Sequence, residues 1–193
     1  MHTHARISHV ILGLVAASTF VLATTHAEAA TVLKVDVPAM VRLSESVVRA
    51  RVAATRNVDL RPSVKSGLFT DVELEILEVI RGPARPGHHI LRLPGGTGAD
   101  GIALTVPGMP RFAPGEEVVV FLEKSAHGHV PCGLEQGVWR VQRAADGTAT
   151  ATQSTTGLQL MARNADGRLK AIEGHPGQVM PLDALLRGIR AAR

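Results

Sequence analysis

The strongest constraint on the fold of this chain is a period-two alternation of apolar and polar residues. It first appears where Val48, Ala50, Val52 and Ala54 alternate with Arg49, Arg51 and Thr55. Because successive side chains of a β-strand point to opposite faces, this alternation is typical of a strand with one buried and one solvated face. We therefore expect a sheet here. Residues 56–67 contain Asn, Pro, Ser and Gly, and we expect them to form an exposed loop.

Residues 69–81 fit two kinds of local structure. Thr70 and Glu73 would form a helical capping box, and Gly82 would end such a helix. The apolar positions nevertheless alternate with acidic ones, which favours a strand: Val72, Leu74 and Ile76 against Asp71, Glu73 and Glu75. The phase of the alternation changes at residues 76–77, so we expect a β-bulge that bends this strand.

Further segments with strand character follow at short intervals, at residues 90–93, 102–106, 118–122, 138–143, 148–153, 158–162 and 168–172. The 118–122 segment is apolar throughout, which suits a central strand buried on both faces. Asp146-Gly147 and residues 164–167 have turn character, and each predicts a hairpin between the segments that flank it. Many short strands with frequent turns are typical of a barrel or a sandwich.

A helical segment is expected before the first of these strands and another after the last. Residues 37–43 have a proline in the first turn, where proline is tolerated, and predict a short helical turn. At about residues 182–191, Leu182, Leu185, Leu186 and Ile189 fall on one helix face. Asp183 near the start, with Arg187 and Arg190 near the end, complements the helix dipole. The expected fold class is therefore mainly β, with a C-terminal amphipathic helix packed against the sheet.

The first thirty residues have the layout of a secretory signal peptide. Arg6 supplies positive charge, an apolar run follows at residues 10–23, and small residues follow that run. This run is shorter than the ~20 residues that a membrane-spanning helix needs. Ala27-Glu28-Ala29 matches a cleavage site, so we expect residues 1–29 to be removed after Ala29. We expect residues 30–193 to form one domain, periplasmic or secreted, with no stable membrane anchor.

Composition narrows the classes of function. Cys132 is the single cysteine, so the chain cannot close an internal disulfide, and we expect this side chain to lie in the core. Aromatic residues make up 3% of the chain and tyrosine is absent, which argues against the stacking platforms of single-strand nucleic-acid binders. The net charge of +4 comes from arginines scattered along the chain, so it is weak evidence for an anionic partner.

Several segments together resemble a group of exported bacterial proteins without assigned activity. They are residues 43–52, 70–82, 110–116 with 118–122, and 133–141. The first two segments are also loosely similar to netrin-like domains, including tissue inhibitors of metalloproteinases, and this resemblance implies a five-stranded OB-like barrel. Those inhibitors bind the zinc of the protease through an N-terminal cysteine and contain many disulfides, and this chain has neither feature. The resemblance therefore implies a fold and no inhibitory activity.

The motifs that could bind a cofactor or carry out catalysis are incomplete. Residues 96–101 satisfy the glycine pattern G-x-G-x-x-G, yet a strand-like segment follows where a dinucleotide site requires a helix, so we expect no cofactor. Neither G-x-S-x-G nor H-E-x-x-H occurs. His127 and His129 would share one face of an extended strand, and with Cys132 they could bind a transition metal.

These observations leave two hypotheses of different classes. The first is a non-enzymatic binding module, acting on a protein partner in the periplasm or outside the cell. The alternative is an exported hydrolase or metal-binding protein that uses His127, His129 and Cys132. An exposed turn is the simpler interpretation of the histidine segment, because Gly128 and Pro131 are typical turn residues.

Overall fold

The computed structural model describes residues 29–61, 63–64, 67–175 and 177–192. Residues 1–28, which include nearly all of the predicted signal peptide, lie outside this range. The strands are β1 (Ala30–Leu33), β2 (Ser46–Asp59), β3 (Leu68–Arg81), β4 (Gly87–Pro94), β5 (Gly96–Thr97), β6 (Ala103–Leu104), β7 (Glu117–Ser125), β8 (Gly128–Pro131), β9 (Val138–Arg143), β10 (Ala149–Gln153), β11 (Leu158–Arg163), β12 (Leu169–Ala171) and β13 (Gln178–Pro181). The helices are α1 (Val37–Leu43), the 3-10 helix η1 (Leu134–Gly137) and α2 (Leu182–Ala191). None of the described helices is long and apolar enough to cross a membrane.

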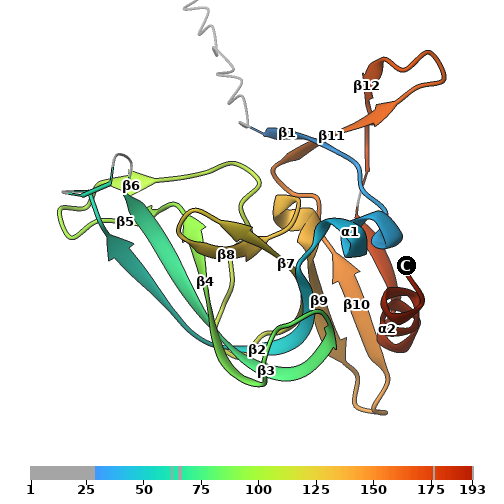
Figure 1. Cartoon of the computed structure of the whole chain (residues 1–193), viewed down its shortest axis with the longest axis horizontal. Coiled ribbons are helices and arrows are strands. Elements are labelled where there is room, and N and C mark those ends of the chain that lie inside the picture. Colours follow the sequence, from blue (N-terminus) through green and yellow to red (C-terminus); the bar gives the residue numbers. More distant parts are fainter. Residues whose placement is uncertain (1–28, 62, 65–66, 176, 193) are drawn as a thin grey trace, which may run out of the picture.

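Five strands close into a small barrel (Figure 1). Strands β7, β2, β3 and β4 are antiparallel neighbours in this order, which is a Greek-key arrangement. Strand β8 closes the barrel because it pairs antiparallel with β7 and parallel with β4. The sheet also continues beyond β7 into β9, β10 and β13. The fold-class prediction is confirmed: the protein is mainly β, with a closed five-stranded barrel and a C-terminal helix.

The long strands β2 and β3 are bent by bulges. Arg49 lies opposite Glu78 and Ala50 lies opposite Ile76, so Leu77 is left over at the predicted bulge. A second register shift leaves Ala53 unpaired, because Val52 lies opposite Leu74 and Ala54 lies opposite Glu73.

The bulge at Ala53 corrects two predictions. It reverses the alternation, so Ala54 is exposed rather than on the buried face with Val52. Thr55 instead takes the position opposite Val72. Strand β2 also continues to Asp59, so the loop predicted at 56–67 begins about four residues later than expected. Pairing with β3 accounts for this extension, because the ladder between the two strands satisfies the backbone hydrogen-bonding groups of these residues. Their turn-like composition had suggested that these groups are hydrated instead.

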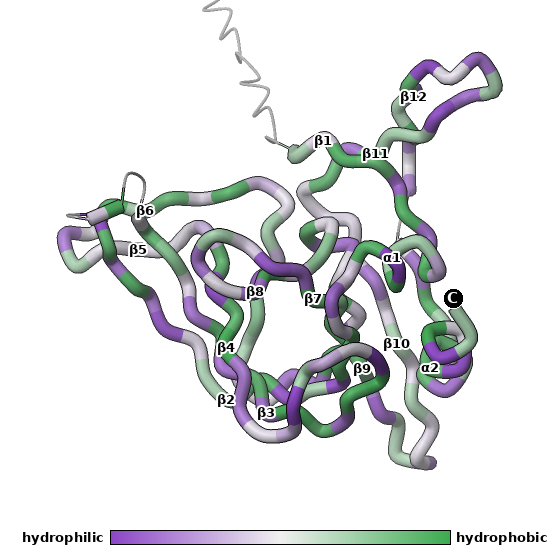
Figure 2. The backbone as a smooth tube through the Cα atoms, viewed as in Figure 1, coloured by the Kyte–Doolittle hydropathy of each residue, from purple (hydrophilic) through white to green (hydrophobic). Residues whose placement is uncertain are grey.

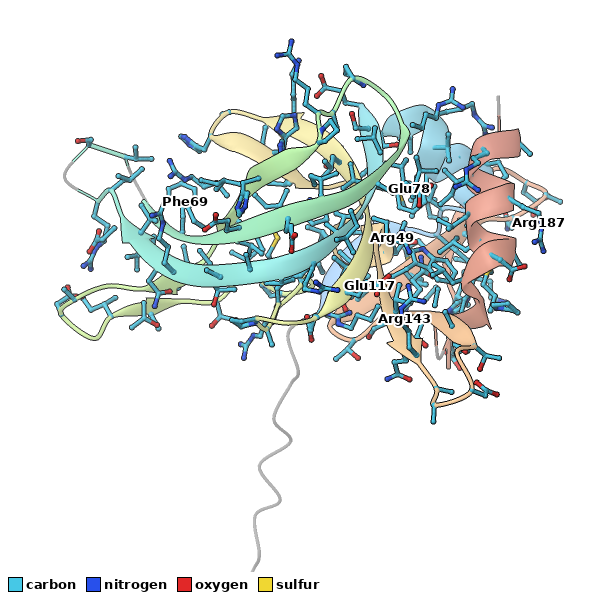
Figure 3. The ribbon with its side chains drawn as sticks, turned by 90° about the horizontal axis from the view of Figure 1, so that it is seen from below. Arg49, Phe69, Glu78, Glu117, Arg143 and Arg187 are labelled. Atoms are coloured by element: carbon cyan, nitrogen blue, oxygen red, sulfur yellow. The ribbon has the colours of Figure 1, made fainter. Side chains whose placement is uncertain are left out.

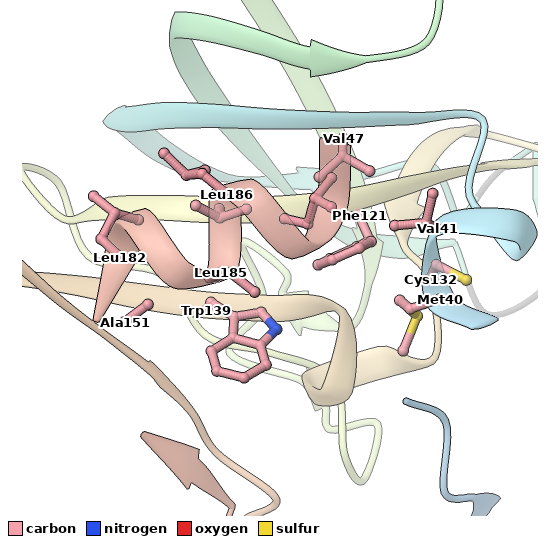
Figure 4. Close-up of a cluster of buried hydrophobic side chains, with 12 residues drawn as sticks. Met40, Val41, Val47, Phe121, Cys132, Trp139, Ala151, Leu182, Leu185 and Leu186 are labelled. Atoms are coloured by element: carbon pink, nitrogen blue, oxygen red, sulfur yellow. The ribbon is translucent and has the colours of Figure 1, made fainter. Parts of the chain in front are cut away.

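Strand β7 separates two hydrophobic clusters, as expected for a central strand. Val118, Val120 and Leu122 face the inside of the barrel. Val119 and Phe121 face the opposite side, where α1 and α2 cover the sheet. Figure 4 shows this second cluster, in which Leu182, Leu185, Leu186 and Ile189 of α2 pack with Trp139. The predicted helix at 182–191 and its apolar face are therefore confirmed.

Charged residues surround the contact between α2 and the barrel (Figure 3). Arg49 lies 3.3 Å from Glu78 and 3.4 Å from Glu117. Arg143 makes two hydrogen bonds to Glu117, and Arg190 of α2 binds Glu78. Because exposed ion pairs are each worth about 0–1 kcal/mol, the apolar cluster contributes most of the energy that holds the helix in place.

A second, smaller sheet extends away from the barrel (Figures 1 and 2). It has the order β1-β11-β12, with β1 parallel to β11, and contains the hairpin predicted around residues 164–167. The strand predicted at 102–106 is reduced to Ala103–Leu104, which pairs with Gly96–Thr97. The glycine pattern at 96–101 therefore belongs to a short hairpin, and no helix follows it.

Candidate functional site

The structure places the three predicted metal ligands in different surroundings. The ring of His127 packs edge-on against Phe69, with ring centres 5.0 Å apart. His129 Nε2 lies 3.0 Å from Glu45 Oε2. Cys132 is buried in the cluster beneath the helices, and this burial raises the pKa of its thiol to about 12. Among the residues that the structure describes, no group of three or more His, Cys, Asp or Glu side chains is placed to hold a metal ion.

His129 instead joins a polar cluster where β4 meets β8. Glu45 binds both His129 and Lys124, the latter at 2.9 Å. The ring of His89, on β4, lies across this junction with its centre 4.7 Å from that of His129. His89 Nε2 is buried and has no hydrogen-bond partner in the described part of the chain. Burial first, and then the neighbouring His129, lower the pKa of His89 below 6.5.

This arrangement predicts that His89 makes the fold sensitive to acid. Since its pKa is lower in the folded protein, the unfolded chain binds the proton more readily. His89 should therefore not destabilise the fold above about pH 6.5. Below that pH the free energy of unfolding should decrease as the pH falls towards the folded pKa of His89. Urea unfolding at several pH values should show that His89→Leu flattens this dependence. The same substitution at the exposed neighbour His88 is the control. An unchanged pH profile in His89→Leu would contradict the assignment.

A pocket of about 420 Å³ lies at the end of the barrel where β4 terminates. Its floor contains Val72 and Leu93, which belong to the inner hydrophobic cluster. Its rim is formed by the segment that connects β4 to β7, from which Met109 and Phe112 pack against the same cluster. The bulge at Ala53 turns Thr55 towards this pocket. The pocket is therefore lined by the barrel interior on one side and by a long connection on the other.

Glycines and polar contacts hold the connecting segment close to the barrel. The Thr70 hydroxyl donates to the Gly95 carbonyl at 2.8 Å, and the Thr97 amide donates to Asn57 Oδ1 at 3.1 Å. A Cβ atom at Gly96 would lie 2.5 Å from the Phe69 carbonyl oxygen, so only glycine allows this approach. The glycine-rich segment at residues 96–101, which no helix follows, thus has a structural role because part of it forms one wall of the pocket.

Among the described residues that line this pocket, Arg111 is the only charged one. Its side chain is exposed and makes no ion pair or hydrogen bond with the described residues, whereas its backbone carbonyl accepts a hydrogen bond from Arg140 Nη2 at 3.0 Å. Thr55 and Thr105 also line the pocket, and their hydroxyls make no hydrogen bond within the described part of the chain. The pocket therefore combines an apolar surface with one cation and spare hydroxyl groups.

A second hollow of about 630 Å³ lies on the other side of the same connecting segment. It contains Glu135, which is 7% exposed and pairs with Arg140 at 2.5 Å. Burial raises the pKa of Glu135, and Arg140 opposes that effect. Arg111 lines both hollows, but Arg140 is already occupied by Glu135. Of these two arginines, Arg111 is consequently the one that remains available to a ligand.

Sequence reasoning did not find this pocket. Thr55, Leu93 and Arg111 are far apart in the chain and become neighbours only when the barrel closes. One signal was available, since the connection from β4 to β7 spans residues 95–116 and contains only two strands of two residues each. Connections of more than about 12–15 residues with so little regular structure are usually functional or disordered.

Comparison with known proteins found no family model, no curated protein and no solved structure that matches this chain. The functional argument therefore depends on the geometry of the barrel and its pocket.

Proposed function

We propose that this chain is a non-enzymatic binding module of the periplasm or the extracellular space, and that its ligand site is the pocket at the end of the barrel. The observation that carries the proposal is the pocket itself. Its volume of about 420 Å³ falls within the range of about 300–1,000 Å³ for ligand sites, which often occupy the mouths of β-barrels. Apolar walls with a few polar groups are the usual composition of such sites.

The residues of the pocket favour binding over catalysis. The described residues that line it include no His, Cys, Ser, Asp or Glu, which are the side chains that most often act as nucleophiles or general acids and bases. Threonine and arginine side chains are present, and they can orient a ligand by hydrogen bonds. This composition supports the hypothesis of a binding module. It provides no support for the alternative of a hydrolase.

The order of the strands supports an OB-like barrel within the wider netrin-like resemblance. The first barrel strand, β2, pairs with both β3 and β7, and the third, β4, lies parallel to the fifth, β8. Barrels of this five-stranded Greek-key type bind varied ligands on one face and in the adjoining loops. The export expected from residues 1–29 would place such a module outside the cytoplasm.

A panel of small amphiphiles tests this proposal. Decyl and phenylbutyl compounds, each with a carboxylate, hydroxyl or ammonium head group, are titrated into the isotopically labelled full chain below their micelle-forming concentrations. We expect at least one to shift the amide signals of residues around Thr55 and Leu93 in NMR spectra.

Two tryptophan variants of exposed strand threonines serve as a matched pair. Thr55→Trp fills the pocket and should abolish the shifts, whereas Thr31→Trp on β1 should leave them unchanged. If no compound of the panel shifts the pocket signals, or if Thr55→Trp binds as well as the native chain, the proposed function is wrong.

A further inference from the structure

We infer that the ligand of this pocket is an amphipathic monoanion, a molecule with an apolar body and one anionic group that binds Arg111. This inference rests on the proposed function, because it names the class of ligand for the same site. The apolar body would contact Met109 and Phe112 on the connecting segment and Leu93 on β4. The anionic group would lie at the rim, where the guanidinium of Arg111 is exposed.

The charges of the pocket support a single anionic group. None of the described residues that line the pocket is acidic, so the positive charge of Arg111 has no acidic partner among them. A ligand with a positive group would be repelled, and a ligand with several negative groups would find no second cation among the described residues of the lining. Burying an unpaired charge is costly, so both kinds of ligand are disfavoured.

Arg111 differs from most arginines of the barrel and its adjoining strands and helix. Among the described residues, nine arginines form ion pairs with carboxylates: Arg49, Arg51, Arg56, Arg61, Arg92, Arg140, Arg143, Arg187 and Arg190. The carboxylate nearest in the adjoining hollow, Glu135, is bound by Arg140. The fold therefore uses most of its arginines internally, and Arg111 is available at a cavity.

The chemistry of the guanidinium matches a carboxylate or a similar oxyanion. Its planar arrangement of donors can make two parallel hydrogen bonds to two oxygens of one group. The hydroxyls of Thr55 and Thr105 line the same pocket and provide further donors for polar groups of the ligand. The backbone of Arg111 is held in place by the hydrogen bond from Arg140, so little ordering of the chain is required when the ligand binds.

Head-group preference is the measurement that tests this inference. For each apolar body, the dissociation constants of the carboxylate, alcohol and ammonium compounds are compared by NMR titration. Because an ion pair with an exposed guanidinium contributes up to about 1 kcal/mol, we expect the carboxylate to bind up to about fivefold more tightly than the alcohol. The ammonium compound should bind most weakly.

Two arginine variants identify the group responsible. Arg111→Gln should remove the preference for the carboxylate and lower the affinity for the alcohol much less than that for the carboxylate, while Arg111→Lys should retain part of the preference. Arg168→Gln is the matched control, because Arg168 is also exposed and makes no ion pair with the described residues but does not line the pocket. Circular dichroism confirms that each variant is folded.

The possible outcomes separate the inference from the proposed function. Equal binding of carboxylate and alcohol at the pocket, stronger binding of the ammonium compound, or a preference that survives in Arg111→Gln would overturn the inference and leave a binding module. Absence of any binding at the pocket would overturn both.

Discussion

Replacing Trp139 with alanine is expected to lower the free energy of unfolding by about 3–5 kcal/mol. Trp139 is only 1% exposed and packs in the cluster that joins α2 to the sheet (Figure 4). Its removal would leave a cavity between Leu185 and the strand β9, and the surrounding side chains could fill that cavity only in part. Since domains of this size are usually stable by about 5–15 kcal/mol, this single substitution could remove much of the total.

Urea unfolding followed by circular dichroism measures this effect, because Trp139 is the only tryptophan and its fluorescence is lost in the variant. Trp139→Phe keeps most of the buried apolar area and should cost clearly less than the alanine variant. Arg187→Ala on the exposed side of α2 should change stability by less than about 0.5 kcal/mol. Equal effects of the Trp139→Ala and Arg187→Ala variants would show that this cluster does not hold the helix to the sheet.

The second large effect is expected at Asp71, a charged residue on the outer face of the barrel that neighbouring side chains shield from solvent. This residue is 2% exposed, and its carboxylate accepts hydrogen bonds from Arg92 at 2.7 and 2.8 Å and from Arg56 at 3.3 Å. Loss of one member of a buried ion pair costs about 3–5 kcal/mol. Because both arginines keep contact with solvent, we expect Asp71→Asn to cost about 2–3 kcal/mol.

The same contacts predict how this contribution depends on pH. Hydrogen bonds from Arg92 are the main cause that lowers the pKa of Asp71 below its ordinary value of 3.8. Its stabilising contribution is therefore complete above that value and is lost as the pH falls through the lowered pKa. Asp71→Asn should flatten the acid limb of a stability profile, whereas Asp183→Asn, whose pairing with Arg187 is exposed, should change it little. If both variants lose the same small amount of stability, Asp71 does not have the role assigned here.

Much of the fold could be predicted from local patterns, because those patterns reflect which face of an element is buried. The apolar run at 118–122 predicted a strand covered on both faces, and β7 has the barrel interior on one side and the helices on the other. The change of phase near Leu77 predicted a bulge, and the pairing of β2 with β3 has one there. The helix at 182–191 was predicted from its apolar spacing, which matches the face that packs on the sheet.

The bulge at Ala53 could not be predicted from the pattern. Alanine fits either face of a sheet, so the sequence Ala53-Ala54 does not indicate where the alternation reverses. Only the pairing with β3 shows that Thr55 lies opposite Val72 and turns towards the pocket. The same limitation applies to His127, His129 and Cys132, which are close in the chain, although a turn, a strand and the core give each of them a different environment.

The sequence alone determined the class of secondary structure, the positions of most strands, the terminal helix and the absence of an internal disulfide. These properties are local, since they depend on which residues alternate, which ones form turns and how many cysteines exist. Tertiary structure decided that five strands close into a barrel and that Thr55, Leu93 and Arg111 meet at one pocket. That meeting depends on strand register and closure, which are set by contacts between residues distant in the chain, so no local pattern contains it.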